Sequence, residues 1–481
     1  MKNYKMWIGG EWVEAASGRV YSDVNPATEE VIARIPQADV EDIDKAVESA
    51  RKAFAVWSKK TQKERSEIIS RIAVSIKDRM EELVQSEILD HGSPMPVARV
   101  FAQMAVQHFE YAAVAGRSVM GEGVIKQHTN TIAYFQREPI GVCACITPWN
   151  FPLMVSAKIS AALTVGNTCV LKPPSICALP ALKLAEILEQ HDLPPGTVNI
   201  VTGPGNVVGK ALASHRDVGM IAFTGSHDTG SAIMAAASRT VKPLFMELGG
   251  KNPFIVLQDA NLNAAVGKAA FASFFNSGMV CACPGRYYIH ESLYDEFTER
   301  FAGAAESLVV GDPTDPKTQM GPVISEEHRT KVERYIKTGI EEGAKLVFGG
   351  KRPTDPALDK GYFILPTVFT HVTQDMKIAR DEIFGPVACF LKFSSEDEVI
   401  EKANDNEYGL CASVWTKNIS KARKFANALQ AGTVWVNDHM GDLDFGLPWG
   451  GFKQSGFGKE NDVMGQEEYT QVKVISITMP E

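Results

Sequence analysis

Apolar side chains in the first part of the chain recur at the spacing of one helix face. Between residues 39 and 58 they occupy positions 43, 47, 50, 54 and 57. Thr61 followed by Glu64 is typical of a capping box. It predicts one long helix that buries positions 68, 72, 76, 80 and 83 and ends at Gly92. The N-terminal part is therefore predicted to be largely helical.

The pattern changes between residues 140 and 250, where short β-rich runs alternate with helical ones. The predicted strands cover 140–146, 169–171, 198–201, 220–223 and 244–247, with helices at 182–190 and 229–237. Such alternation predicts a parallel sheet with helices on both faces. Ligands of such sheets bind beyond the carboxyl ends of the strands, where this sequence gathers small, polar and charged residues. We expect a nucleotide there.

A second alternating α/β region runs from about 250 to 448. Residues 119–138 look like an isolated strand pair, and the tail at 469–478 alternates as a strand too. Strands outside the main sheets usually need a partner chain to cover their edges. The pattern therefore predicts a homo-oligomer, either a dimer or a tetramer.

Composition narrows the class of protein. The 481 residues carry a net charge of −9 with no long run of Lys or Arg, which argues against nucleic-acid and anionic-membrane partners. No apolar stretch is long enough to span a membrane, and the first residues lack a signal peptide's apolar core, so we expect a cytoplasmic protein. Eight cysteines, most of them in apolar runs, form neither a disulfide framework nor a zinc-ligand pattern; no metal is expected.

Cys281 is a candidate nucleophile. It follows a helical pattern that ends near Gly278, and Arg286 stands five residues later. A thiolate needs a partly open and electrostatically favourable setting of this kind. The alternative is a buried structural cysteine.

Three other motifs have two interpretations each. Glu247 ends an apolar run, and it is either an ion-pair partner of Lys251 or a general base whose pKa burial raises. Asn150, between two prolines, is either a turn cap or an oxyanion donor. The glycines at 203, 205 and 209 form either a phosphate loop or a plain strand-to-helix turn, since they miss the dinucleotide fingerprint.

Taken in order, the motifs make a recognisable set. They are Trp7-Ile8-Gly9-Gly10-Glu11-Trp12, Asn25-Pro26-Ala27-Thr28, Pro148-Trp149-Asn150-Phe151-Pro152, Leu171-Lys172-Pro173, Phe223-Thr224-Gly225-Ser226, Glu247-Leu248-Gly249-Gly250-Lys251, Asn276-x-Gly278-x-x-Cys281, Glu382-Ile383-Phe384-Gly385-Pro386-Val387 and Pro448-Trp449-Gly450-Gly451-Phe452-Lys453-Gln454-Ser455-Gly456. Over nearly its whole length the chain resembles the aldehyde dehydrogenase superfamily.

The resemblance implies an α/β fold in three parts: a Rossmann-like parallel-sheet cofactor domain (1–118 and 139–248), an α/β catalytic domain (249–448) and a small β oligomerisation element (119–138 and 463–481). It implies oxidation of an aldehyde to its carboxylic acid, with NAD or NADP as hydride acceptor and a thioester intermediate. Cys281 would be the nucleophile, Glu247 the base that activates water, and Asn150 the oxyanion donor.

The resemblance also implies binding residues. Lys172 would bind the adenosine ribose, Ser226 the pyrophosphate, Glu382 and Phe384 the nicotinamide ribose, and Gly205 and Gly209 the adenine side. Further cofactor contacts are expected from Ile146, Thr147, Pro148, Trp149, Ser175, Phe223, Gly225 and Leu248. The substrate pocket is expected to include Phe151, Val280, Ala282 and Phe445. Trp449 in the Pro-x-Gly-Gly motif is similar to betaine-aldehyde and aminoaldehyde members.

Three positions depart from the family pattern. Met279 replaces the usual Gln and should change polarity beside the substrate. Ser175 replaces the Glu that binds ribose hydroxyls in NAD-preferring members, so NADP should be tolerated. Ala157 stands where many members have Trp and should widen the channel.

Other functions also have to be considered. Asp442 and Asp444 are either a cation-recognising patch or solvated loop carboxylates. A CoA-acylating enzyme and a catalytically inert structural relative are the competing functions. Glu247 argues against the first, and intact Cys281, Glu247 and Asn150 argue against the second.

Overall fold

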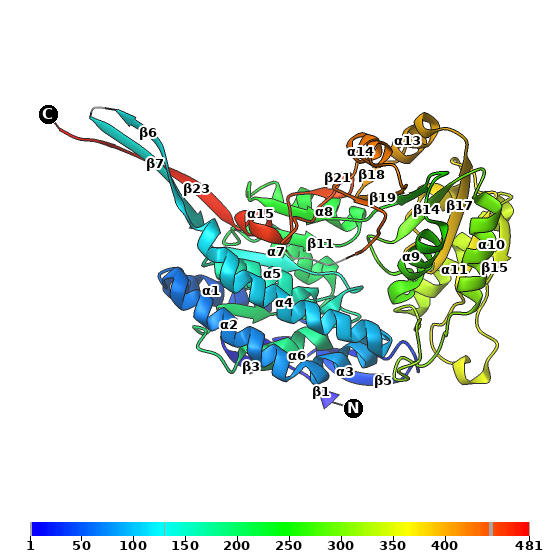
Figure 1. Ribbon diagram of the computed structural model, residues 1–481. Coiled ribbons are helices and arrows are strands. Elements are labelled where there is room, and N and C mark those ends of the chain that lie inside the picture. The colour runs from blue at the N-terminus through cyan, green and yellow to red at the C-terminus, as the bar shows by residue number, and fades with distance from the viewer. Residues whose placement is uncertain (1, 129, 442–445, 481) are drawn as a thin grey trace.

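The computed structural model describes residues 2–128, 130–441 and 446–480 (Figure 1). Its N-terminal helices are α1 (Val40–Trp57), α2 (Gln62–Asp78), α3 (Met80–His91) and α4 (Met95–Val119). Capping boxes at Asp39 and Thr61 begin α1 and α2, as the second was predicted to do. Gly92 ends α3 at φ 77°, where an added Cβ would lie 2.7 Å from Pro322.

The single long helix predicted after Thr61 is wrong. Arg79 leaves helical geometry at φ −105° and ψ 20°, so that α2 ends and α3 starts on either side of it. The break turns α3 onto α6 (Leu179–Leu188), and the Arg79 guanidinium donates to the backbone of Glu186 in that helix. Apolar periodicity continues through such a one-residue break and does not reveal it.

The first large sheet has eight strands in the order β22-β12-β11-β8-β9-β10-β2-β3. Its parallel centre holds the five predicted strands, found as β8 (Val142–Ile146), β9 (Thr168–Lys172), β10 (Val198–Ile200), β11 (Met220–Thr224) and β12 (Leu244–Glu247). Antiparallel strands close both edges: β2 (Met6–Ile8), β3 (Glu11–Val13) and β22 (Gly456–Phe457).

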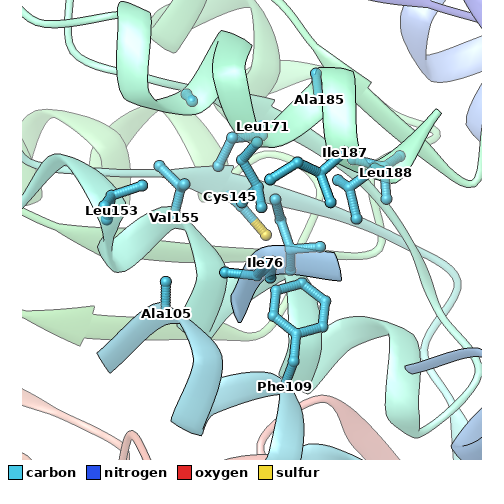
Figure 2. Close-up of a cluster of buried hydrophobic side chains, with 14 of the residues drawn as sticks. Ile76, Ala105, Phe109, Cys145, Leu153, Val155, Leu171, Ala185, Ile187 and Leu188 are labelled. Atoms are coloured by element: carbon cyan, nitrogen blue, oxygen red, sulfur yellow. The ribbon is translucent and has the colours of Figure 1, made fainter. Parts of the chain in front are cut away.

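Helices cover both faces of this sheet, as predicted. Along β8, Cys143 and Cys145 pack with α2, α4, α5 (Val155–Thr164) and α6, whereas Val142 and Ala144 pack with α1, α7 (Lys210–Ser214) and α8 (His227–Ala237). Figure 2 shows the first of these layers, where Ile76 and Phe109 meet Cys145. All eight cysteines are free thiols, and six are buried.

The second large sheet has seven strands in the order β15-β16-β17-β14-β13-β19-β20 and is parallel except at β15. The strands are β13 (Asn252–Val256), β14 (Pro284–His290), β15 (Lys345–Phe348), β16 (Thr367–Thr370), β17 (Val387–Phe393), β19 (Cys411–Trp415) and β20 (Thr433–Val436). The helices of this region are α9 (Leu262–Phe274), α10 (Tyr294–Glu306), α11 (Glu326–Glu341), α12 (Lys377–Arg380), α13 (Glu396–Asn404) and α14 (Ile419–Ala428). The predicted second α/β region is confirmed.

Smaller elements complete the fold. β1 (Lys2–Asn3), β4 (Val20–Val24) and β5 (Val31–Pro36) make a three-stranded sheet, and β18 (Tyr408–Gly409) pairs with β21 (Phe452–Lys453). The predicted strand pair is found as β6 (Glu122–His128) and β7 (Thr131–Pro139), and the predicted tail strand, β23 (Thr470–Thr478), pairs with β7. These three strands project from the body as an arm, reached through α15 (Asp462–Glu467) (Figure 1). Among the described residues, no helix is long and apolar enough to cross a membrane.

Candidate active site

One cavity of about 2410 Å³ connects the carboxyl ends of β8, β9, β11 and β12 with α4 and α9. It is lined by nineteen of the site residues predicted from the sequence: Ile146, Thr147, Pro148, Trp149, Asn150, Phe151, Lys172, Gly205, Gly209, Phe223, Gly225, Ser226, Glu247, Leu248, Val280, Cys281, Ala282, Glu382 and Phe384. Ser175 does not line the wall, because its hydroxyl donates to the Gly203 carbonyl at 2.8 Å. Phe445, Asp442 and Asp444 lie outside the described residues.

A strained turn brings Cys281 to the cavity. After α9, a 3-10 turn (Phe275–Gly278) holds Asn276, Ser277 and Gly278 at φ 50°, 55° and 71°. The Asn276 amide donates to the Asn150 carbonyl at 2.8 Å, and the Ser277 hydroxyl donates to the Gly321 carbonyl at 2.9 Å. A Cβ at Gly278 would collide with the backbone of Gly385, so only glycine fits. The turn leaves Cys281 partly exposed.

Asn150 lies just beyond β8, next to this turn. Its amide nitrogen donates to the Met279 carbonyl at 3.0 Å. An amide carries two N–H groups, and the second has no acceptor among the described residues. One N–H of the Asn150 amide is thus bound to the backbone two residues before Cys281, and the other N–H is available to a ligand.

One of the expected effects on the substrate channel is wrong. The Met279 side chain packs in the core of the second sheet with Val323 and Ile324, so it does not change polarity in the cavity. Ala157 is buried in α5 and does not reach the wall, whereas its neighbour Lys158 lines the cavity. That Ala157 widens the channel stays a prediction.

Glu247 ends β12 with its carboxylate buried. Trp449 Nε1 donates to its Oε1 at 2.8 Å, and Oε2 has no partner among the described residues. Burial raises the pKa of Glu247 to about 8, and Glu460 raises it further, against the lowering effect of Trp449. The structure gives Glu247 no ion pair with Lys251, which favours the general-base interpretation.

A buried ion pair lies beside Glu247. Lys158 Nζ is 3.0 Å from Glu460 Oε1, with exposed side-chain fractions of 2% and 11%. Both groups act on the pKa of Glu247, and both line the cavity. The sequence did not predict this ion pair or the Trp449 contact. Lys158 and Glu460 are 302 residues apart, and no motif near either position indicates that they meet.

The expected electrostatic support of Cys281 by Arg286 is wrong. Burial raises the pKa of the Cys281 thiol well above its ordinary value, and Glu247 and Glu382 raise it further. Arg286 instead points into the protein, where it donates to the carbonyls of Lys251 and Ala403. These effects favour the neutral thiol over the thiolate at Cys281.

The strand ends form a binding surface suited to a dinucleotide. Lys172 is buried, donates to the Pro173 carbonyl at 2.8 Å, and has its pKa lowered to about 8 by burial. Ser226 caps α8, and the neighbouring Thr224 hydroxyl is buried without a partner among the described residues. Gly205 begins a π-helical turn (Gly205–Gly209), and a Cβ added to it would have no other atom within 4 Å. Buried donors beside a helix N-terminus suit a pyrophosphate.

Glu382 and Phe384 close the same cavity from the second sheet. The Gly250 N–H donates to Glu382 Oε1 at 3.0 Å, and a Cβ at Gly249 would displace that carboxylate. Phe384 adopts φ 62°, and its ring packs edge-on against Trp149 at 5.3 Å.

His328 of α11 supports Phe384 and was not predicted. Its Nε2 donates to the Phe384 carbonyl at 2.6 Å, and its ring centroid lies 5.0 Å from that of Trp149. Burial lowers the pKa of His328 to about 4, so the imidazole is neutral. The sequence around His328 has no motif that could have revealed it.

Comparison with known proteins decides the family. The model of the aldehyde dehydrogenase family matches residues 12–475. The chain belongs to the aldehyde dehydrogenase family. It is 44% identical to the betaine aldehyde dehydrogenase of Bacillus subtilis over 97% of this chain and 96% of that protein. It is 42% identical to the human mitochondrial aldehyde dehydrogenase, over 99% and 92% respectively.

Solved structures agree with this assignment. The betaine aldehyde dehydrogenase of Staphylococcus aureus in complex with NAD+ superposes with a TM-score of 0.97 at 38% identity, covering 99% of this chain and 95% of that one. An aldehyde dehydrogenase of Bacillus cereus, also an NAD+ complex, gives 0.97 at 40% identity, covering 99% and 97%. This aldehyde dehydrogenase therefore has the family fold and is an oxidoreductase that converts an aldehyde to its carboxylic acid.

Proposed function

We propose that this aldehyde dehydrogenase uses Cys281 as nucleophile, Asn150 as oxyanion donor and Glu247 as general base. One observation carries the proposal: three residues far apart in the sequence meet around one cavity. Asn150 is hydrogen-bonded to the carbonyl of Met279, two residues before Cys281, and Glu247 is close enough to raise the pKa of the Cys281 thiol.

The proposed reaction has two halves. The Cys281 thiol gives its proton to water, and its sulfur bonds to the aldehyde carbon. The oxyanion that forms accepts hydrogen bonds from the Asn150 amide and the Cys281 backbone N–H. Loss of hydride from the same carbon leaves a thioester on Cys281. Glu247 then takes a proton from a water that attacks the thioester carbon, which releases the acid and returns the sulfur.

NAD is the proposed hydride acceptor, because two solved relatives are complexes with NAD+ and the donors at the strand ends suit a dinucleotide. Lys172 would hold the adenosine ribose, Ser226 the pyrophosphate, and Glu382 with Phe384 the nicotinamide ribose. When bound, the nicotinamide supplies the site that accepts the hydride. Residues 1–118 and 139–248 would form this cofactor domain, and 249–448 the catalytic domain.

Cys281→Ala and Glu247→Gln test the proposed function. Cys281→Ala should lower aldehyde oxidation at least about 10³-fold, whereas Glu247→Gln should still release one equivalent of reduced cofactor before turnover stops. Cys389→Ala, a buried thiol away from the cavity, is the matched control. Absence of the burst would contradict the role of Glu247, and stimulation by CoA would favour an acylating enzyme.

NADP should also be accepted. Ser175 follows the cavity-lining Pro174 and carries no charge, so it does not repel a 2′-phosphate. We expect kcat/KM for NAD to exceed that for NADP by less than about a hundredfold, and Ser175→Glu to widen the gap. A larger preference for NAD in the parent enzyme would refute this proposal.

The arm is the proposed oligomerisation element, formed by residues 119–138 and 463–481. On β23, Val472, Val474 and Ile477 are 54%, 61% and 49% exposed. Such a strand favours pairing with a second copy. Val474→Lys should shift the dimer or tetramer toward monomer in light scattering. The cytoplasmic location stays a prediction.

A further inference from the structure

Cys281 lies in a tight turn of the backbone. The Cys283 N–H donates to the Val280 carbonyl at 2.9 Å, so Cys281 and Ala282 are the two central residues of a β-turn. The Cys281 N–H has no acceptor in the part of the chain that the structure describes, and it is therefore available to an oxyanion. Its direction is fixed by the planar peptide unit that it shares with the Val280 carbonyl.

The peptide unit between Ala282 and Cys283 is held from outside the turn by His439. Its carbonyl accepts a hydrogen bond from His439 Nε2 at 2.8 Å. Because a carbonyl can only accept, Nε2 carries the ring proton, and Nδ1 accepts from the Ser413 hydroxyl at 3.2 Å. The Cys411 thiol lies 3.6 Å from the same carbonyl but is a weak donor. His439 is therefore the main external contact of this peptide unit.

Packing and backbone geometry fix the His439 ring. The ring is fully buried, and its centroid lies 4.9 Å from that of Trp435 and 5.8 Å from that of Phe254. Asn437 and Met440, on either side of it in the sequence, adopt φ 56° and 51°, a conformation that costs free energy in residues other than glycine. A buried ring within a strained segment indicates that the fold holds this imidazole in one orientation.

His439 is neutral at physiological pH. Burial lowers its pKa to about 4, against the raising effects of the Ala282 carbonyl and Asp438, and Lys268 lowers it further. Lys268 and Asp438 pair with each other at 2.8 Å. The ring does not line the cavity. The imidazole can therefore act on the reaction through its hydrogen bond and not by exchanging a proton with the substrate.

We propose that His439 is a positioning residue for the oxyanion donor on Cys281. Its hydrogen bond orients the peptide unit whose N–H belongs to Cys283, and that N–H holds the Val280 carbonyl. The Val280 carbonyl in turn shares its peptide unit with the Cys281 N–H. Hydrogen bonds in such a chain polarise one another, so the His439 contact also strengthens the Cys281 N–H as a donor. This inference rests on the proposed function, in which that N–H binds the oxyanion.

Asn252 holds a different peptide unit of the same turn and provides a comparison within the site. Its amide donates to the Cys281 carbonyl at 2.7 Å, and the peptide unit of that carbonyl carries the Ala282 N–H. The Ala282 N–H lowers the pKa of the Cys281 thiol through a hydrogen bond. Loss of the Asn252 amide should therefore change the ionisation of the sulfur, whereas loss of the His439 donor should weaken the oxyanion site alone.

His439→Phe and His439→Gln in the full-length enzyme test the proposal. His439→Phe keeps a ring against Trp435 but removes the donor. It should lower kcat/KM for the aldehyde, per active site titrated by the burst, about 10- to 100-fold, with the dissociation constant of NAD unchanged. His439→Gln keeps an N–H donor and should restore kcat/KM to within about fivefold of the parent value.

Alkylation of Cys281 by iodoacetamide is the second readout, because it needs the thiolate but forms no oxyanion. Its rate constant, followed by mass spectrometry, should stay within about twofold of the parent value in His439→Phe and fall about tenfold in Asn252→Ala. His290→Phe is the matched control: His290 bonds to the Ser292 hydroxyl, packs on Phe393 at 5.4 Å and lies outside the cavity, so neither rate should change.

The outcomes separate a positioning role from a structural one. Parent-like kcat/KM in His439→Phe, or equal losses in His439→Phe and His439→Gln, overturns the proposal. A matching fall in the alkylation rate of His439→Phe shows general damage to the turn and overturns it as well. A parent enzyme that is alkylated at Cys281 but oxidises no aldehyde with NAD or NADP contradicts the proposed function instead.

Discussion

The two ends of the active-site cavity are built in different ways. The cofactor end consists of turns that follow parallel strands, as at Lys172, Ser226 and Glu247, with glycines where the backbone must come close to a neighbour. The substrate end consists of side chains on the faces of α4 and α9. The first construction depends on backbone geometry and the second on how helices pack.

The two ends of the cavity should therefore differ in how well they tolerate amino-acid substitutions. At the cofactor end, a Cβ at Gly249 would displace the Glu382 carboxylate, which accepts the Gly250 N–H, so one substitution disturbs a contact between the two sheets. At the substrate end, replacement of one helix side chain changes the wall without disturbing a turn. We therefore expect changes at the cofactor end to alter cofactor binding or catalysis, and changes at the substrate end to alter the choice of aldehyde.

Among the changes that compare the two ends, the largest effect is expected where they meet. Asn150→Ala should lower kcat about 10²- to 10³-fold with little change in KM for NAD, because it removes an oxyanion donor. Steady-state kinetics measure it. If kcat stays within tenfold of the parent value, Asn150 is a structural turn cap and not an oxyanion donor.

The next effect concerns pH. Glu247 must be deprotonated to act as base, and burial raises its pKa to about 8. Hydrolysis of the thioester should therefore rise about tenfold per pH unit up to about 8 and then level off. Pre-steady-state traces at several pH values would show it in the phase after the burst. The pKa of this carboxyl also depends on Glu460, Lys158, Lys459 and Trp449. Because the Trp449 hydrogen bond lowers that pKa, Trp449→Phe should move the inflection to higher pH. An inflection near 4.5 would contradict the assignment.

The smallest effect tests whether the cofactor end needs support from the second sheet. His328→Phe keeps a ring against Trp149 but removes the hydrogen bond to the Phe384 carbonyl. We expect KM for NAD to rise roughly two- to tenfold, with KM for the aldehyde unchanged. His328→Gln, which keeps a donor, should recover part of the loss, and His290→Gln on the surface is the control. Equal changes in both KM values would show general loss of structure instead.

Local signals explain what could be predicted from the sequence. The run at 244–247 is β12, and Thr61 with Glu64 caps α2, because each depends on neighbouring residues. Most predicted site residues share one cavity for the same reason: they lie at the ends of parallel strands, which meet along one edge of the sheet.

Tertiary packing explains the rest. The break at Arg79 depends on how α3 packs on α6, and the Met279 side chain packs in a core built by residues far along the chain. Arg286 is only five residues from Cys281, yet its strand carries it away from the sulfur. Lys158 meets Glu460 across 302 positions, a contact that no local pattern can indicate.

The C-terminal segment has a consequence for biosynthesis. Strand β22 pairs with β12 through Gly456 and Glu247, the Ser455 carbonyl accepts the Leu248 N–H, and Trp449 holds the carboxylate. A nascent polypeptide can form the central strands of both sheets while these last residues are still inside the ribosome. Its general base has no fixed position until they emerge, so a chain truncated before Trp449 would lack the contacts that hold Glu247 and would be catalytically incomplete.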